Sequence, residues 1–369
     1  MKRMKLLLAT APLSLVALLS VPPVRSSAGE VTVHTEASPR LASVVSTRTG
    51  NPERNGKIAF IRNRGGAVDV FVVNPSGMTP INLTSSRADE LYVDWSPNGR
   101  HVVFTRFGQG GRNLFRISRR GTGLLRLTTG RASDEVPRWS PDGAAIAFDR
   151  TRDDAQSEVF VVDARGEDVT RLTNNDVGDH VGGWSPDGTQ IAIYRGVLDT
   201  EPFDIWVVNA DGSGENQLTD DPADEFSPVY SPDGTRIAFM RRLGEQWDIF
   251  VMNADGTDVT QLTDDPLDDA FPQWSPQGDR ILFSRGRLEG VPRLDVMVMS
   301  ADGSDERALT VGPADDFSPT WSPDGAWVSF VSDRSSNWEL YVIGADGERL
   351  NRISRTRAFE FDPDWGTRP

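Results

Sequence analysis

The chain has 369 residues, a formal net charge of −15 at neutral pH and no cysteine. Without cysteine, disulfides, a cysteine nucleophile and a lipid-modified cysteine are excluded. The negative charge disfavours nucleic acid and anionic membrane surfaces as partners and favours basic protein segments or cations.

The first 28 residues have the composition of a Sec-type signal peptide. A basic start at residues 2–5 is followed by an apolar stretch at 6–20 and by small residues at 26–28. The apolar stretch is shorter than the roughly 20 residues that span a bilayer. We therefore expect cleavage near Ala28 and a periplasmic or secreted mature chain that does not insert into a membrane.

Residues 29–55 contain Ser, Thr, Pro and Arg without apolar periodicity. This composition predicts a flexible linker, and the segment is too short for a second domain. Residues 56–369 are then expected to form one monomeric domain.

From residue 57 to residue 365 the chain repeats one set of motifs. Each unit contains a branched and aromatic run such as Ile237–Phe239, a second apolar run such as Asp248–Met252, and a polar run ending in Leu-Thr, as at Leu262-Thr263. Short runs of this kind, bounded by Gly, Pro and Asn, predict strands. An aromatic residue, usually followed by Ser-Pro-Asp-Gly, closes the remaining run at Trp95, Trp139, Trp184, Tyr230, Trp274, Trp321 and Trp365.

The spacing of these aromatic residues predicts a β-propeller of four-stranded blades. The steps range from 44 residues (95 to 139) to 47 residues (274 to 321), which is the length of one blade. In the turn after each aromatic residue, Pro fixes φ at the first position and Gly takes the left-handed position, so we predict a three-residue hairpin loop.

The two ends of the repeat region are offset. Each strand type occurs seven times, but the chain begins with the second type near residue 57 and ends with the first type at Trp365. We predict an all-β, seven-bladed propeller in which the C-terminal strand pairs with the N-terminal blade, because this leaves no open sheet edge. A six-bladed disc with one incomplete blade is the alternative.

An acidic residue stands five positions before the repeated aromatic residue in every unit. If Ser96 pairs with Arg100 across the first loop, this acidic residue faces an arginine on the next strand. The acids are Glu90, Asp134, Asp179, Glu225, Asp269, Asp316 and Glu360; the arginines facing all but Asp316 are Arg106, Arg150, Arg195, Arg241, Arg285 and Arg62. Opposite charges across a strand pair stabilise a sheet by roughly 0.2 to 1 kcal/mol. We predict a structural ring of salt bridges at the channel end. These residues and His180 are also the candidates for binding.

Asp316 departs from the pattern because Ser332 stands opposite it, with Arg334 nearby. A calcium site is the alternative to the salt-bridge ring, since Ca²⁺ takes several carboxylate oxygens. Its candidate ligands are Asp316, Asp315, Asp268 and Asp224. No segment has the Asp-x-Asp-x-Asp-Gly spacing of a calcium loop, so we predict no cofactor and expect the acidic loop residues to cap strand ends.

The repeat motifs resemble the TolB-type, WD40-like propeller repeat. Trp-Ser-Pro-Asp-Gly, Ile-Ala-Phe, Asp-Ile-Phe-Val-Met-Asn-Ala-Asp-Gly and Gln-Leu-Thr carry the resemblance, which is clearest in residues 231–263 and covers 57–365. It implies a periplasmic or secreted scaffold that binds proteins; TolB itself works in an envelope-spanning complex with a peptidoglycan-associated lipoprotein. The chain departs from TolB in having seven repeats instead of six and no α/β domain before them, so TolB's partner-binding residues are not carried over.

Catalytic functions have less support in the sequence. Related propellers occur joined to serine peptidases, but the Gly-x-Ser-x-Gly motif of those enzymes is missing. Metal-dependent polysaccharide lyases resemble the chain in fold and gather several histidines, whereas His34, His101 and His180 are dispersed here. His180 beside Asp179 is the one pair suited to acid–base chemistry.

Four tryptophans are candidates for a glycan surface: Trp206, Trp247, Trp327 and Trp338. We expect Trp206 to be buried between blades, and Trp247 and Trp338 to be exposed at loop edges.

Together these patterns predict an exported, non-catalytic propeller scaffold that binds a protein or another macromolecule. Specificity is expected in the variable loops at 196–202 and 286–292, because a rigid frame usually presents its binding residues on loops. A carbohydrate-active enzyme or a glycan-binding propeller is the alternative.

Overall fold

A computed structural model describes residues 51–63, 66–77, 79–152, 156–197, 200–287 and 293–369. The predicted signal peptide, His34 and residues 29–50 of the predicted linker lie outside these ranges, as do residues 198–199 and 288–292 of the two variable loops. The described part is all-β as predicted, with a single 3₁₀ turn, η1 (Pro52–Arg54), as its helical element.

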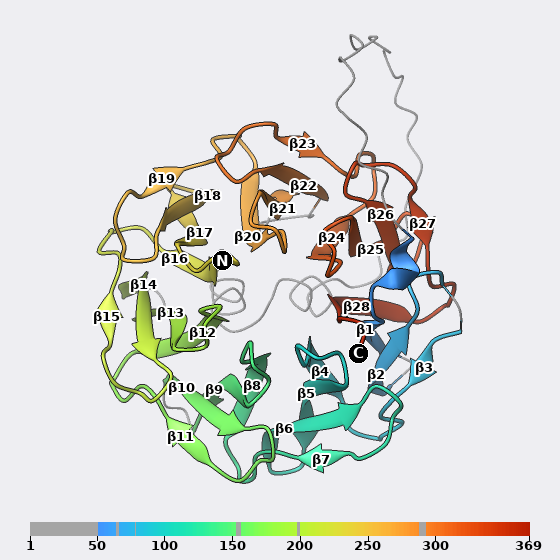
Figure 1. Cartoon of the computed structure of the whole chain (residues 1–369), viewed down its shortest axis with the longest axis horizontal. Coiled ribbons are helices and arrows are strands. Elements are labelled where there is room, and N and C mark those ends of the chain that lie inside the picture. Colours follow the sequence, from blue (N-terminus) through green and yellow to red (C-terminus); the bar gives the residue numbers. More distant parts are fainter. Residues whose placement is uncertain (1–50, 64–65, 78, 153–155, 198–199, 288–292) are drawn as a thin grey trace.

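The strands fall into four positions from the centre of the disc outward (Figure 1). The innermost strands are β4 (Glu90–Trp95), β8 (Ser133–Trp139), β12 (Gly178–Trp184), β16 (Glu225–Tyr230), β20 (Asp268–Trp274), β24 (Asp316–Trp321) and β28 (Phe359–Trp365). The second strands are β1 (Ile58–Asn63), β5 (His101–Gly108), β9 (Ala145–Thr151), β13 (Gln190–Val197), β17 (Arg236–Leu243), β21 (Arg280–Gly286) and β25 (Trp327–Ser332). The third are β2 (Val68–Val73), β6 (Gly111–Ser118), β10 (Ser157–Asp163), β14 (Glu201–Asn209), β18 (Gln246–Asn253), β22 (Leu294–Ser300) and β26 (Glu339–Gly344). The outermost are β3 (Ile81–Asn82), β7 (Leu125–Arg126), β11 (Val169–Arg171), β15 (Asn216–Gln217), β19 (Thr260–Gln261), β23 (Arg307–Ala308) and β27 (Asn351–Arg352).

Strands from the four positions pair into antiparallel four-strand groups arranged around a common centre (Figure 1). The groups β4–β7 and β8–β11 join into one eight-stranded sheet through a single parallel pair, Arg112 with Ser133. β28 pairs with β1, so the last strand of the chain completes the sheet that begins with the first, as the sequence predicts. This pairing covers the edge of β1 that would otherwise be open.

Two parts of the repeat motif recur in the packing, one within a group and one between neighbouring groups. The phenylalanine of the second strand is fully buried in the groups that have one, as at Phe148. Except at Phe283, which faces Met297, it stacks or tilts against an aromatic residue of the third strand of the same group, as with Phe160 at a centroid distance of 5.8 Å. The tryptophan that ends the innermost strand donates its Nε1–H to a backbone carbonyl of the preceding group: Trp184 to Arg138 at 3.0 Å and Trp274 to Val229 at 3.1 Å. Trp95 and Trp321 make the same bond to the preceding group, whereas Trp365 bonds to Gly56 beside its own sheet and Trp139 Nε1 has no partner among the described residues.

The Leu-Thr motif at the end of each outer strand satisfies backbone and carboxylate groups at once. Thr173 Oγ1 accepts the N–H of Val159 at 3.0 Å and donates to Glu158 at 2.6 Å. Hydroxyl oxygens at the same position, from Thr84 to Ser354, accept the equivalent backbone N–H in the other groups. A hydroxyl is required there because it can donate and accept together.

The predicted three-residue hairpin loop is wrong. The N–H of Ser96 donates to the carbonyl of His101, not to that of Arg100, so the loop comprises Pro97–Arg100. A β-bulge between Leu91 and Asp94 then shifts the register by one residue, and Glu90 meets Arg106 as predicted. The same bulge recurs in the other innermost strands. The predicted charge pairing is therefore right even though the assumed loop is not, because the longer loop and the bulge offset each other.

Candidate functional site

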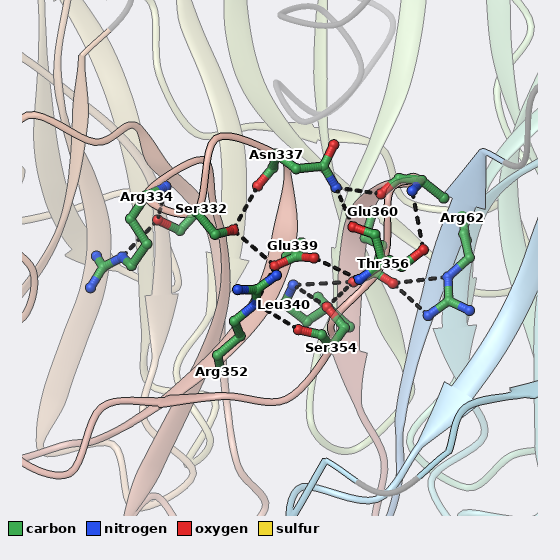
Figure 2. A network of polar contacts seen from close by, with 12 residues as sticks. Arg62, Ser332, Arg334, Asn337, Glu339, Leu340, Arg352, Ser354, Thr356 and Glu360 are labelled. Carbon is green, nitrogen blue, oxygen red and sulfur yellow. Dashed lines mark hydrogen bonds and ion pairs between the residues drawn. The ribbon is translucent and has the colours of Figure 1, made fainter.

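The predicted salt-bridge ring is present. Each of the six predicted arginine–carboxylate pairs lies in cross-strand register. The guanidinium Nε to carboxylate distances run from 2.5 Å for Arg195–Asp179 to 2.8 Å for Arg106–Glu90 and Arg62–Glu360. Figure 2 shows the Arg62–Glu360 pair joining β1 to β28, beside the Glu339–Arg352 pair of the preceding group.

The ring is buried inside the groups. Every carboxylate of the ring has a side-chain exposure of at most 1%. Each arginine also stacks over aromatic rings, as Arg150 does over Phe148 and Phe160 at 5.1 and 4.7 Å, so its charge is held between a carboxylate and π faces. Burial raises the pKa of Glu225 to about 7, although Thr219 and Arg241 act in the opposite direction.

Asp316 departs from the ring as the sequence predicts. Ser332 stands opposite, and Arg334 reaches across to place Nη2 2.7 Å from Asp316 Oδ2 (Figure 2 shows Arg334 bonded to Ser332). Asp316 Oδ1 is buried without a hydrogen-bond partner among the described residues. Burial and the nearby Asp333 raise the pKa of Asp315 to about 6.

The candidate metal ligands cap strands. Asp224, Asp268 and Asp315 each accept a backbone N–H at the start of the third strand of the group that precedes their own, at 3.3, 3.1 and 3.3 Å. Their carboxylates thus satisfy donors that the sheet leaves unpaired. Within the described ranges, no three or more His, Cys, Asp or Glu side chains form a group that could hold a metal ion.

A central cavity of about 330 Å³ lies where the innermost strands converge. The bulged segments of these strands, including Val136, Gly182 and Ser227, form its wall. None of the predicted ring residues is among the residues that line it. The bulges therefore turn one set of side chains toward the cavity and leave the charge ring within the sheets.

The wall of the cavity is asymmetric. On β4 and β28 it carries three carboxylates, Asp94, Asp362 and Asp364, whereas β20 and β24 contribute Phe271 and Phe317 on another side. Burial and the nearby Asp364 raise the pKa of Asp94, and burial raises that of Asp362 to about 6. Each of the three accepts a backbone N–H, so their positions are fixed: Asp94 from Trp139, Asp362 from Val93 and Asp364 from Trp95, at 2.7, 3.2 and 2.7 Å.

Arg138 of β8 lines the same cavity beside these carboxylates. It is close enough to lower the pKa of each of them against the effect of burial. Among the described residues its guanidinium has no hydrogen-bond or ion-pair partner. One arginine facing three carboxylates leaves the cavity with an acidic excess.

The predicted pairing of His180 with Asp179 is wrong. His180 Nδ1 lies 2.9 Å from Asp149 Oδ2 on the neighbouring group, and its ring stacks on Tyr194 at 5.0 Å. Asp179 bonds to Arg195 instead, because successive side chains of a strand point to opposite faces. His180 is buried and does not line the cavity. Tyr194, on which its ring stacks, does. His101 lies at the start of β5, on a different strand.

The candidate tryptophans do not form one exposed surface. Trp247 and Trp327 are buried, so the expected exposure of Trp247 is wrong. Trp206 is half-buried and carries Arg195 over its ring at 4.4 Å, while Trp338 packs edge-on against Phe317. Trp247 packs against Phe226 instead of facing solvent.

Comparison with known proteins supports the repeat assignment. Residues 272–368 match the family model of the TolB beta propeller domain. A putative TolB from Agrobacterium tumefaciens has 26% sequence identity and a TM-score of 0.55, covering 73% of this chain and 95% of its own. The propeller is TolB-like. No curated protein sequence matches the chain.

Enzymes share the fold of this TolB-like propeller. An oligogalacturonate lyase in complex with manganese has 16% identity and a TM-score of 0.61, covering 82% of this chain and 86% of its own. A puromycin hydrolase has 15% identity and a TM-score of 0.66, covering 84% of this chain and 54% of its own. Both are similar in fold. In the described part of the chain, no helix is long and apolar enough to cross a membrane.

Proposed function

We propose that this TolB-like chain is an exported, seven-bladed scaffold that binds a protein partner in the cell envelope or outside the cell, without catalysis. The central cavity carries the proposal. Its acidic side suits a basic side chain, and its phenylalanine side suits an apolar neighbour of that side chain.

The fixed geometry of the carboxylates strengthens this reading. Asp94, Asp362 and Asp364 are held by backbone N–H groups before any ligand arrives. A preorganised acidic wall binds a cation without first ordering its own side chains. The raised pKa of Asp94 comes from burial and from Asp364, and an incoming cationic group would relieve that repulsion. A basic segment of a protein partner meets these requirements.

The blade count and export complete the proposal. The four-strand groups and the pairing of β28 with β1 support a closed ring of seven blades. The basic, apolar and small-residue pattern of residues 1–28 supports export.

Quantitative affinity capture from an envelope extract of the producing cell tests the proposal. The bait is compared with its Asp94→Asn/Asp364→Asn variant and with a surface control, Asp211→Asn/Asp255→Asn, which loses the same charge on exposed turns. We expect a partner captured in stoichiometric amount by the wild type and the control but not by the cavity variant. Equal capture by all three baits would refute the cavity as the site. Depolymerisation of oligogalacturonate with added Mn²⁺ would refute the non-catalytic assignment.

A further inference from the structure

One four-strand group, β4–β7, reverses the charge of its turns. The turn after the third strand reads Asn-Ala-Asp-Gly at 209–212 and 253–256, whereas the equivalent residues at 118–121 are Ser-Arg-Arg-Gly. The preceding hairpin turn has Asn98 where most groups have Asp, and it continues into Arg100. Arg119 and Arg120 thus stand where two other groups have alanine and aspartate. The next group has one arginine in this turn, Arg165, whereas β4–β7 has two in succession.

These turns and the end of the chain enclose a basic pocket of about 630 Å³. The pocket is lined by Arg100, Arg119, Arg120, Arg368, His101, Ser118, Thr122 and Pro369, and no acidic side chain is among them. The two turns are joined by a hydrogen bond from the N–H of Arg119 to the carbonyl of Arg100, at 2.9 Å.

The final residues are fastened against the first turn. Thr367 Oγ1 donates to the carbonyl of Pro97 at 2.6 Å, and the N–H of Gly366 donates to the carbonyl of Lys57 at 3.0 Å. A Cβ placed on Gly99 would lie 2.1 Å from the carbonyl oxygen of Thr367, so the two backbones are in direct contact. This contact holds Arg368 among the residues that line the pocket.

The arginines that line the pocket are not paired with acidic side chains, although the α-carboxylate of Pro369, another lining residue, brings one negative charge. Within the described part of the chain, the guanidinium groups of Arg100, Arg119, Arg120 and Arg368 have no hydrogen-bond or ion-pair partner. Burial is the main cause that lowers the pKa of His101, and the charges of Arg116 and Arg100 lower it further. Burial and then Arg119 lower the pKa of Lys57 in the same way. Protonated neighbours therefore repel one another here, which is the reverse of the paired arginines of the charge ring.

Arg116 supplies a second, independent sign. Its place in the third strand is taken by valine in the other groups: Val72, Val161, Val207, Val251, Val298 and Val342. Arg116 Nε is buried and has no hydrogen-bond partner among the described residues. A buried donor without a partner costs stability. Arg116 does not line the pocket, but its charge lowers the pKa of His101, which does.

We propose that this pocket binds a compact multivalent oxyanion, of the phosphate or polycarboxylate class. Arginine is suited to both because its planar fork pairs with two oxygens of one group. The net charge of −15 favours a compact ligand, since an extended polyanion would also meet the acidic remainder of the surface. The pocket shares no lining residue with the central cavity, so this proposal and the proposed function stand or fall separately.

Isothermal titration of the purified protein with pyrophosphate and with citrate at low ionic strength tests the proposal. The variants are Arg120→Asp and, as the matched control, Arg165→Asp, the same change at the same turn position of the next group, outside the pocket. Arg119→Ala/Arg120→Asp is a further variant that installs the Ala-Asp-Gly turn of residues 210–212 and is therefore expected to fold.

We expect saturable binding to the wild type and to Arg165→Asp, and a loss of roughly ten- to a hundredfold in both pocket variants. Binding should weaken with added salt. A preference for pyrophosphate would indicate a phosphate-bearing ligand, and a preference for citrate a carboxylate-bearing one. Failure of both probes to bind, equal affinity of Arg120→Asp and Arg165→Asp, or binding of a DNA oligonucleotide in place of either probe would overturn the proposal.

Discussion

The Asp134–Arg150 pair allows the structural role of the charge ring to be measured. Arg150 donates from Nε and Nη2 to the two oxygens of Asp134 at 2.6 and 2.8 Å, and the side chains are 9% and 1% exposed. Arg150→Met keeps much of the side-chain length and the contact with Phe148 and Phe160 but leaves a buried carboxylate alone. Removing one partner of a buried ion pair costs about 3 to 5 kcal/mol. For a domain of this size that is roughly 5 to 8 °C in Tm.

Urea and thermal unfolding monitored by tryptophan fluorescence would give this value. The control is Arg349→Met, because Arg349 and Asp346 are 48% and 36% exposed and approach only to 3.7 Å; an exposed pair contributes about 0 to 1 kcal/mol. Asp134→Asn added to Arg150→Met should restore part of the stability. If Arg150→Met cost no more than Arg349→Met at neutral pH, the ring would not be a stabilising feature.

Three further outcomes are expected. Thr173→Val should lower the free energy of unfolding in urea by roughly 1 to 3 kcal/mol, because it leaves the Val159 N–H unpaired. The control Thr170→Val, on the exposed outer strand, should be nearly neutral. Equal costs of the two variants would contradict the role of the Leu-Thr motif. The pKa of Glu225 is raised to about 7, so its protonation contributes stability that is fully present below the unfolded pKa near 4.5 and is lost as pH rises through 7. The free energy of unfolding of Glu225→Gln should therefore depend less on pH between about 4.5 and 7 than that of the wild type. Parallel pH profiles of the two proteins would contradict the raised pKa. EDTA should leave Tm unchanged, and a decrease that Ca²⁺ reverses would revive the calcium site.

Much of the fold follows from the sequence because most groups are packed by the same residues at the same positions. The tryptophan that bonds to the preceding group, the fully buried phenylalanine and the hydroxyl of Leu-Thr recur at fixed spacing, so strand positions and charge pairs can be predicted from them. The bulge could not be predicted: its left-handed residue is Tyr92 in one strand and Phe271 in another, which have no intrinsic preference for that conformation. Tertiary pairing imposes it.

The candidate site was less accessible to sequence reasoning. His180 bonds to Asp149, 31 positions away, and Trp247 packs against Phe226; such contacts between groups depend on how far one sheet is rotated against the next. The central cavity was missed because the bulge decides which side chains face it. The basic pocket had a visible signal in Arg119 and Arg120, since no other turn of that type carries two arginines.

Repetition itself separates structural residues from candidate functional ones in this chain. A residue that the frame requires must occur in every group, whereas a residue that contacts a ligand needs to occur once. The position just before the repeated aromatic residue shows the difference. It is Asp94, Arg138, Gly183, Val229, Gln273, Thr320 and Asp364 in successive groups, and all of these except Gly183 line the cavity. The residue four positions earlier is always acidic and always buried. The net charge of the whole chain is a poor guide to a local binding site, because a site that occurs once contributes little to the total. This net charge averages many acidic turns with one basic group, so it points to basic partners and gives no sign of the anionic ligand that Arg100, Arg119 and Arg120 favour locally.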